Sequence, residues 1–170
     1  SLALASGSGN AANYSLSSAT VNITQRPLDL HASRNYDGTV TINGSDFSTF
    51  GNIVSGQTLS ATGSGTVSSA NVGTGKTVTS VNLALANGTG LASNYSINSL
   101  NAEVTGRPVT ISGSRAYDST TTASSSILTI TSGVSGESLS LTGSGVLGAA
   151  SAGTQTVINN NTLAIADGSG

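Results

Sequence analysis

Hydrophobic and polar residues alternate along much of the chain, in short runs separated by glycine and asparagine. Val81, Leu83 and Leu85 lie two positions apart, and Leu139 and Leu141 have the same spacing. Side chains of a β-strand alternate between two faces, so each run presents its apolar side chains on one face. Short strands with turn residues roughly every 8–12 positions are typical of small β-sandwiches. The pattern therefore predicts an all-β protein.

One stretch of sequence occurs twice, 81 positions apart. One copy runs from Asn13 to Asp37 and the other from Asn94 to Asp118, and each contains Asn-Tyr-Ser, an Arg-Pro step and a Tyr-Asp pair. The Gly-Ser-Gly at 63–65 recurs at 143–145, at a spacing of 80 rather than 81, because one residue is lost in a loop. We therefore expect tandem β-sandwich-like domains, Ig-like or of a related compact β fold, of about 80 residues each.

The apolar positions change phase at each Arg-Pro step, which locates the unit boundaries. Val21 and Ile23 have odd numbers, whereas Leu28 and Leu30 have even numbers. A single flat strand across the step would expose half of its apolar side chains, and proline suits the start or the edge of a strand. We interpret these steps as junctions through which the chain runs nearly straight. The two junctions are Arg26-Pro27 and Arg107-Pro108.

The junctions divide the chain into three segments. Residues 1–25 correspond to 82–106 and are the expected closing strands of a preceding repeat, residues 26–106 form a complete repeat, and residues 107–170 lack the last strands of theirs. A competing division near residues 83–85 leaves the change of phase unexplained. The strands expected in the complete repeat are 28–33, 39–43, 52–55, 57–62, 66–69, 77–85, 95–98 and 101–105.

Residues 1–25 are expected to follow the same pattern as the end of the complete repeat. An apolar run at 2–4 leads to a turn at Ser6-Gly7, and strands are expected near 14–16 and 19–24.

The sequence lacks the residues that several classes of function and structure require. They make up 7% of the chain, the formal net charge is −2, and there is no cysteine. Binding of nucleic acid requires clustered Lys and Arg, a membrane-spanning helix requires about 20 apolar residues, and a disulfide framework requires cysteine. We therefore expect no nucleic-acid partner, no membrane insertion and no disulfides.

The side chains that enzymes use form no recognisable constellation. Residues 73–77 resemble the end of a phosphate-binding loop, but Ala70 stands where that motif has its first glycine, and no long apolar helix follows. His31 is the only histidine, and strand alternation places it on the face opposite Leu30, toward solvent. We expect neither an enzyme nor a cofactor.

The Tyr-Asp pairs are expected to be structural. An aspartate in a turn accepts backbone hydrogen bonds, whereas Ca²⁺ requires about 6–8 oxygen ligands, usually with several carboxylates. No Asp-x-Asp cluster occurs, so we expect no metal. The tyrosines are expected to be core or corner residues rather than platforms for sugars. The residues to which we assign a structural role are Arg26, Pro27, Tyr36, Asp37, Gly38, Arg107, Pro108, Tyr117 and Asp118.

These motifs resemble those of a known family. Asn13-Tyr14-Ser15, Arg26-Pro27-Leu28, Tyr36-Asp37-Gly38-Thr39 and residues 73–78 are similar to the YDG/MBG (mostly β, glycine-rich) repeats of very large bacterial surface and two-partner-secreted, filamentous haemagglutinin-like adhesins. The second copy departs from the pattern, with Ser119 in place of the glycine and a segment at 153–156 that lacks the lysine. The resemblance implies a stalk or spacer role at the bacterial cell surface or outside the cell.

We therefore expect a structural stalk or spacer segment of an adhesin, supporting adhesion or a biofilm matrix, with neighbouring repeats of the same protein as its partners. One alternative is a module that binds a glycan or a host protein through an exposed loop with Phe47 and Phe50. Another is self-association, in which the closing strands of one molecule complete the last unit of another in a strand-exchanged oligomer.

Overall fold

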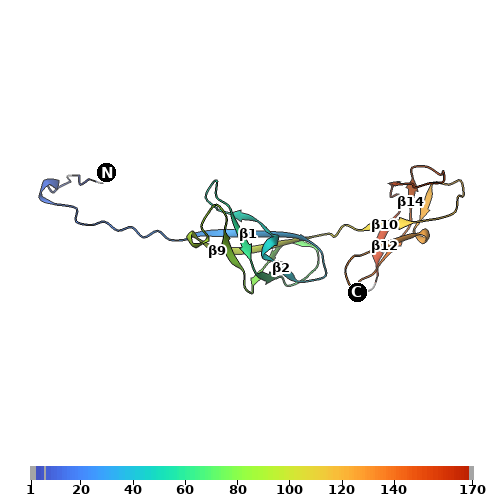
Figure 1. Cartoon of the computed structure of the whole chain (residues 1–170), viewed down its shortest axis with the longest axis horizontal. Helices are drawn as coiled ribbons and strands as arrows, with labels where there is room; N and C mark the ends of the chain where they lie inside the picture. Colours follow the sequence, from blue (N-terminus) through green and yellow to red (C-terminus); the bar gives the residue numbers. More distant parts are fainter. Residues whose placement is uncertain (1–2, 6, 169–170) are drawn as a thin grey trace.

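The computed structural model of the protein describes residues 3–5 and 7–168. Figure 1 shows an extended N-terminal segment, a central body and a C-terminal body along the long axis. We call residues 26–105 the central unit and residues 107–168 the C-terminal unit. The regular structure of the described ranges consists of strands and single 3₁₀ turns, so the protein is all-β. No helix in those ranges is long and apolar enough to cross a membrane.

The central unit contains nine strands in three sheets. The largest sheet has the order β3-β1-β9-β6, and the others are β2-β5-β7 and β4-β8. The elements are β1 (Arg26–Asn35), β2 (Thr41–Asn43), η2 (Gly44–Asp46), β3 (Phe47–Gly51), β4 (Leu59–Thr62), β5 (Ser64–Thr66), β6 (Gly73–Thr77), β7 (Thr79–Ser80), β8 (Ala84–Asn87), η3 (Ala92–Asn94) and β9 (Tyr95–Thr105).

The first and last strands of the central unit, β1 and β9, lie side by side and run parallel. Their register extends over ten pairs, from Arg26 with Tyr95 to Asn35 with Thr105. Because both strands run in the same direction, the chain enters the unit at one end and leaves it at the other. β1 also pairs antiparallel with β3, and β9 pairs antiparallel with β6, so these two strands form the centre of the sheet.

Two β-bulges explain apolar spacings that do not fit a simple alternation. Phe47 and Phe50 are three positions apart, yet both pack on the core, because the register between β1 and β3 shifts between His31 and Ala32. The register between β1 and β9 also shifts, because Leu28 pairs with Ile97 and Asp29 pairs with Ser99, so Asn98 is the extra residue in β9. A bulge inserts an extra residue and so restores the apolar side chains to the buried face.

The core of the central unit draws side chains from all three sheets. Leu28, Leu30 and Ala32 of β1 are fully buried, and they belong to one cluster with Ile42 of β2 and Leu59 of β4. β9 contributes Tyr95 and Ala102 to the same cluster. Burial of each large aliphatic side chain stabilises the fold by about 1.5–3 kcal/mol.

The C-terminal unit repeats the strand pairing of the central unit at an offset of 80 or 81 residues, but with fewer strands. Pairing of β10 with β12 matches that of β1 with β3, and pairing of β13 with β16 matches that of β4 with β8. The elements are β10 (Thr110–Gly113), β11 (Thr122–Ser124), η4 (Ser125–Ile127), β12 (Leu128–Thr131), β13 (Leu139–Thr142), β14 (Ser144–Leu147), β15 (Val157–Asn159) and β16 (Ala164–Asp167).

The core of the C-terminal unit is more open than that of the central unit. Ile111 stands at the position of Leu30, yet it is 38% exposed, whereas Leu30 is 1% exposed. Among the described strands β10 pairs with β12 alone, and none of them lies along the edge that corresponds to the β9 side of β1. The missing neighbour accounts for the exposure of Ile111.

The strands expected near 14–16 and 19–24 are not present. The N-terminal segment contains η1 (Ala11–Asn13), and residues 14–25 are extended without a strand partner. Tyr14, Leu16, Val21 and Ile23 are between 52% and 90% exposed. A strand needs neighbours to satisfy its backbone groups, and here none lies against this segment. Leu2 and Ser6, part of the expected apolar run and turn, lie outside the described residues.

Other strand expectations also differ from the structure. Of the strand expected at 66–69, only Thr66 lies in a strand, at the end of β5. Residues 52–55 form a turn rather than a strand, because Asn52 has a left-handed backbone (φ 65°). The strand before that turn, β3, was not expected, because the bulge obscures its alternation. The two strands expected at 95–98 and 101–105 are one strand, β9, with a bulge. The single strand expected at 77–85 is divided into parts of β6, β7 and β8.

Equivalent core substitutions should affect the two units unequally. Leu30→Ala should lower the free energy of unfolding of the central unit by about 2–5 kcal/mol, because it leaves a cavity in a fully buried site. Ile111→Ala should reduce the stability of the C-terminal unit by less than half as much, since Ile111 is already partly exposed. Pulse-labelling hydrogen exchange along a urea series, analysed on peptides of each unit, measures both losses. Equal losses would contradict the difference in burial.

Candidate functional site

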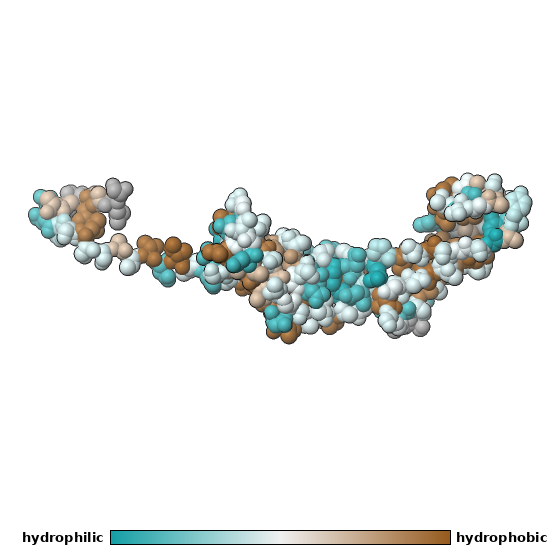
Figure 2. All heavy atoms as spheres, viewed as in Figure 1, coloured by the Kyte–Doolittle hydropathy of each residue, from teal (hydrophilic) through white to brown (hydrophobic). Residues whose placement is uncertain are grey.

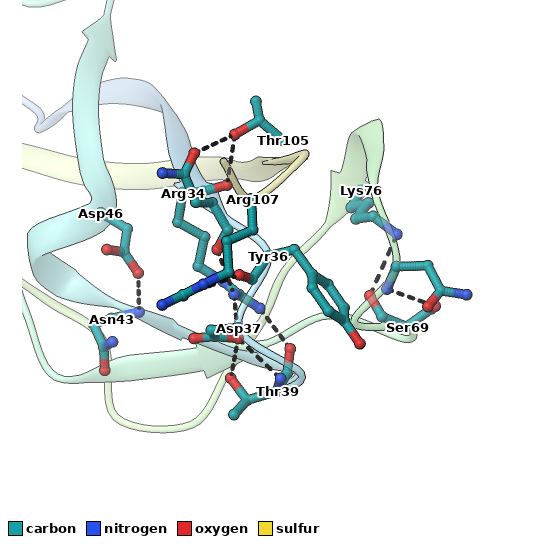
Figure 3. Close-up of polar contacts among 12 residues, drawn as sticks. Arg34, Tyr36, Asp37, Thr39, Asn43, Asp46, Ser69, Lys76, Thr105 and Arg107 are labelled. Carbon is teal, nitrogen blue, oxygen red and sulfur yellow. Dashed lines mark hydrogen bonds and ion pairs between the residues drawn. The ribbon is translucent and has the colours of Figure 1, made fainter. Parts of the chain in front are cut away.

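The Tyr36-Asp37-Gly38 turn follows β1 and is closed by an ion pair. The guanidinium of Arg34 contacts the carboxylate of Asp37, and its Nη2 donates a hydrogen bond to the Thr39 carbonyl at 2.5 Å. Asp37 Oδ1 also accepts hydrogen bonds from the backbone N–H and the hydroxyl of Thr39, both at 2.9 Å. Figure 3 shows these side chains converging on the turn. The Arg34 side chain is only 7% exposed, so the ion pair fixes a buried cation.

The turn lowers the pKa of Asp37 below its ordinary value. Desolvation by burial acts in the opposite direction and is the largest single effect, but the two hydrogen bonds from Thr39 and the charge of Arg34 together outweigh it. The ionised form of Asp37 is therefore the form that stabilises the turn.

The C-terminal unit contains the same turn with one different residue. Arg115 forms an ion pair with Asp118, and Asp118 Oδ1 accepts hydrogen bonds from the N–H and the hydroxyl of Thr120 at 2.9 Å. Gly38 has a φ of 79°, and Ser119 at the equivalent position has a φ of 61°. Left-handed backbone is unfavourable for residues with a Cβ, so Ser119 adopts this geometry under strain.

Tyr36 joins the central unit to the C-terminal unit. Its hydroxyl donates a hydrogen bond to the carboxylate of Glu137, and this bond is the main cause of the raised pKa of Tyr36, followed by desolvation and the charges of Glu137 and Asp37. A Cβ at Gly38 would lie 2.8 Å from Cγ1 of Val134. Turn and loop thus approach so closely that only glycine fits at this position.

Arg107 lies at the same contact. Its Nη1 donates a hydrogen bond to the Tyr36 carbonyl at 3.5 Å, and a Cβ on Gly133 would lie 3.1 Å from its Nε. The backbone N–H of Tyr36 donates a hydrogen bond to the carbonyl oxygen of Thr105 at 2.9 Å. The end of β9, the Tyr-Asp-Gly turn and the junction therefore form one structure (Figure 3).

Arg26, the equivalent of Arg107, binds a loop of its own unit. Its Nε and Nη2 donate to the carbonyl and to Oδ1 of Asn52, at 2.5 and 2.7 Å. Nδ2 of Asn52 donates to the Pro27 carbonyl at 2.8 Å. These contacts connect the start of β1 to the loop after β3.

The remaining residues with an expected role lie partly in strands and partly on the surface. Pro27 lies in β1, and Pro108 lies between β9 and β10. Tyr117 is 69% exposed, so the expectation of a core or corner residue is wrong for it, because no loop covers it as Val134 and Glu137 cover Tyr36. The exposed loop expected at Phe47 and Phe50 is also wrong, since Phe47 is 5% exposed in β3 and Phe50 packs against the core.

Sequence reasoning missed several residues of this site. No structural role was assigned to Arg34, Asn52, Val134 and Glu137, nor to Thr39, although Thr39 belongs to the Tyr-Asp-Gly-Thr motif. For Arg34 and Thr39 a signal existed, because Arg115 and Thr120 repeat them at a spacing of 81. Glu137 had no such signal, because Gln57 stands at the equivalent position.

The described residues contain no group of three or more His, Cys, Asp and Glu placed to hold a metal ion. The polar contacts of the site hold a turn and a junction in place, and its side chains interact with one another.

A family model described as YDG domain matches residues 20–106, which is about half of the chain and includes the Tyr36-Asp37-Gly38 turn. No curated protein and no solved structure matches the chain.

Exchanging the third residue of the turn should change stability in opposite directions in the two units. Ser119→Gly should stabilise the C-terminal unit by about 0.5–1 kcal/mol, because it relieves left-handed strain. Gly38→Ser should destabilise the central unit by about 1–2 kcal/mol and loosen the contact with Val134. Urea unfolding resolved by unit, as above, measures both effects. A loss of stability in Ser119→Gly would exclude strain at this position.

Acid should weaken the turn through Asp37. Its pKa is lowered by folding, so its contribution is present above the pKa of the unfolded chain and is lost as pH falls through the folded value, below about pH 4. Asp37→Asn should be less stable at neutral pH and should lose less stability between about pH 4.5 and pH 2. Urea midpoints over this pH range measure the slope. An unchanged slope would show that Asp37 does not contribute to acid sensitivity.

Proposed function

We propose that this chain, which belongs to the YDG domain family, is a structural stalk or spacer segment built from tandem β-sandwich-like units of a bacterial cell-surface or secreted adhesin. The observation that carries the proposal is the parallel pairing of β1 with β9, which brings the chain into and out of the central unit at opposite ends. Units joined in this way extend in a line, as a spacer requires.

The same pairing suits a unit that bears tension. A pull along the chain draws β1 toward one end and β9 toward the other, so it shears ten register pairs together. Separating two strands from one end would break the pairs in succession, which needs less force at any moment. The core side chains Leu28, Leu30, Ala102 and Val104 also lie on these two strands and would have to slide past each other.

The junction limits bending between the units. Only residues 106–109 connect β9 with β10, and the contact of Tyr36 with Glu137 and the position of Arg107 hold the turn of one unit against a loop of the next. Short connections with a polar contact across them favour a fixed alignment. Figure 1 shows the two units arranged end to end.

The proposed setting is extracellular and supports adhesion or a biofilm matrix, and the proposal includes no catalytic step. It draws on the likeness of the motifs to adhesin repeats and on a surface with little charge. The alternative of a ligand-binding loop at Phe47 and Phe50 loses its basis, because these side chains pack in the core.

The direction of pulling should determine the strength of the central unit. Handles on Gln25→Cys and Gly106→Cys load β1 and β9 in shear, and handles on Asn35→Cys and Gly106→Cys load the same two strands from one end. The chain has no other cysteine. Single-molecule force spectroscopy should give a several-fold higher unfolding force for the first pair, because the register pairs break together.

Both variants keep the core intact, and their urea unfolding should match that of the unmodified chain. Similar unfolding forces in the two directions would remove the mechanical argument for a spacer.

A further inference from the structure

We propose that the two residues after the third strand of each unit, Asn52-Ile53 or Ser132-Gly133, determine whether the junction arginine holds its own unit or the unit before it. We call these two residues the loop pair, and the junction arginines are Arg26 and Arg107. The inference deepens the proposed spacer role and rests on it, because it assigns the alignment of neighbouring units to one pair of residues.

The loops that follow β3 and β12 are equivalent at an offset of 80 residues. Both contain the sequence Val-Ser-Gly, at 54–56 and 134–136. Both close with a backbone hydrogen bond, from the N–H of residue 57 to the Val54 carbonyl at 3.0 Å and from the N–H of residue 137 to the Val134 carbonyl at 3.3 Å. The loops can therefore be compared residue by residue.

The loop pair sets the position at which the backbone turns left-handed. In the central unit this residue is Asn52, with a φ of 65°, whereas in the C-terminal unit it is Gly133, with a φ of 68°. Asn and Gly are the residues that tolerate this conformation best. The pair Asn-Ile therefore favours the left-handed turn at its first residue, and Ser-Gly favours it at its second, so the two loops take different paths.

Asn52 uses its amide to hold the Arg-Pro step of its own unit. Its Oδ1 accepts a hydrogen bond from Arg26 Nη2 at 2.7 Å, its carbonyl accepts one from Arg26 Nε at 2.5 Å, and its Nδ2 donates to the Pro27 carbonyl at 2.8 Å. An amide side chain donates and accepts at the same time. All of these contacts lie within the central unit, so they do not depend on what precedes it.

Ser132 is turned into its own loop instead. It is 8% exposed, and its hydroxyl donates to the Glu137 carbonyl at 2.9 Å and accepts the Val134 N–H at 3.2 Å. Serine has no amide with which to hold Arg107 as Asn52 holds Arg26. Its hydroxyl fixes the backbone of Glu137, whose carboxylate accepts the hydrogen bond from the hydroxyl of Tyr36 in the unit before it.

Gly133 gives Arg107 room to reach the preceding unit. A Cβ at Gly133 would lie 3.1 Å from Nε of Arg107 and 3.2 Å from its Nη2, so the guanidinium lies against bare backbone. From there its Nη1 lies 3.5 Å from the Tyr36 carbonyl oxygen. Figure 3 shows Arg107 beside Tyr36, and Figure 2 shows hydrophilic residues on the end of the central unit that faces the C-terminal unit. An isoleucine in place of Gly133 would displace the guanidinium.

The loop pair therefore separates two kinds of junction. A unit with Ser-Gly holds the Tyr-Asp-Gly turn of the unit before it, through its arginine and its glutamate. A unit with Asn-Ile uses the arginine within itself, so the junction before it lacks this contact and bends more freely. A spacer that contains both kinds would have stiff and flexible junctions at positions set by two residues of each unit.

Spin labels in the whole chain measure how the two units are aligned. Ser68→Cys and Thr142→Cys place labels at exposed positions of the central and the C-terminal unit, and the chain has no other cysteine. Double electron–electron resonance gives the distribution of distances between the labels, which should be narrow in the otherwise unmodified chain. A broad distribution there would overturn both this inference and the fixed alignment that the spacer role requires.

Exchange of the loop pair tests the inference directly. Ser132→Asn with Gly133→Ile should turn Arg107 onto its own loop and release the Tyr36 turn, so the distance distribution should become as broad as in Arg107→Ala with Tyr36→Phe. The matched control is Ser135→Asn, because Ser135 is exposed in the same loop, and it should keep the narrow distribution. A narrow distribution after the exchange, or equal broadening in the control, would overturn the inference and leave the spacer proposal intact.

The variant Arg107→Ala with Tyr36→Phe separates loss of the junction contacts from damage to the C-terminal unit. Because both contacts are already absent in this variant, the loop exchange should broaden its distribution no further. Additional broadening would show that the exchange acts within the C-terminal unit, and a variant as narrow as the unmodified chain would show that these contacts do not hold the junction. Either result would overturn the inference.

The reverse substitution tests the central unit without disturbing its core. Asn52 is exposed, so Asn52→Ser should leave the unit folded. The substitution removes the amide that holds Arg26, so the Nε–H of Arg26 should exchange with water several-fold faster in NMR spectra. An unchanged exchange rate would show that Asn52 does not hold Arg26, which would overturn the inference.

Discussion

The parallel pairing of β1 with β9 is the contact on which the rest of the structure depends. It brings together the buried side chains of both strands, and β3 and β6 join the sheet through these two strands. The chain contains a comparison of its own, because the described part of the C-terminal unit repeats the pairings of the central unit that do not involve β9. There Ile111 is exposed where Leu30 is buried, and residues 153–156, which correspond to most of β6, form no strand. One strand thus accounts for the difference between a closed core and an open one.

The Tyr-Asp-Gly turn has two roles that follow from its place at the end of β1. Within the unit, Asp37 neutralises the buried Arg34 and orders the turn through Thr39. Between the units, Tyr36 and the bare backbone of Gly38 meet the loop of the next unit. This turn fixes both the end of β1 and the contact with the next unit, which is the alignment that the proposed spacer role requires.

Much of the fold could be predicted, and the errors have common causes. The alternation of apolar residues identified an all-β chain, and β1, β4 and β9 lie where strands were expected. β3 was missed because a bulge places Phe47 and Phe50 on one face at a spacing of three. Of the site, the Tyr-Asp turn was expected. Glu137 was not expected, because a contact between loops that are distant in the sequence leaves no repeating pattern of residues.

The sequence by itself determined which residues are apolar, where the chain turns and which segments are equivalent, because these properties depend on each residue and its near neighbours. Only the tertiary structure decided which segments become strands. Residues 14–24 and 95–105 have nearly the same pattern, yet the second forms β9 and the first is extended and exposed. The physical reason is that a strand forms its hydrogen bonds and buries its side chains against a neighbour, and the parallel neighbour β1 lies beside only one of them.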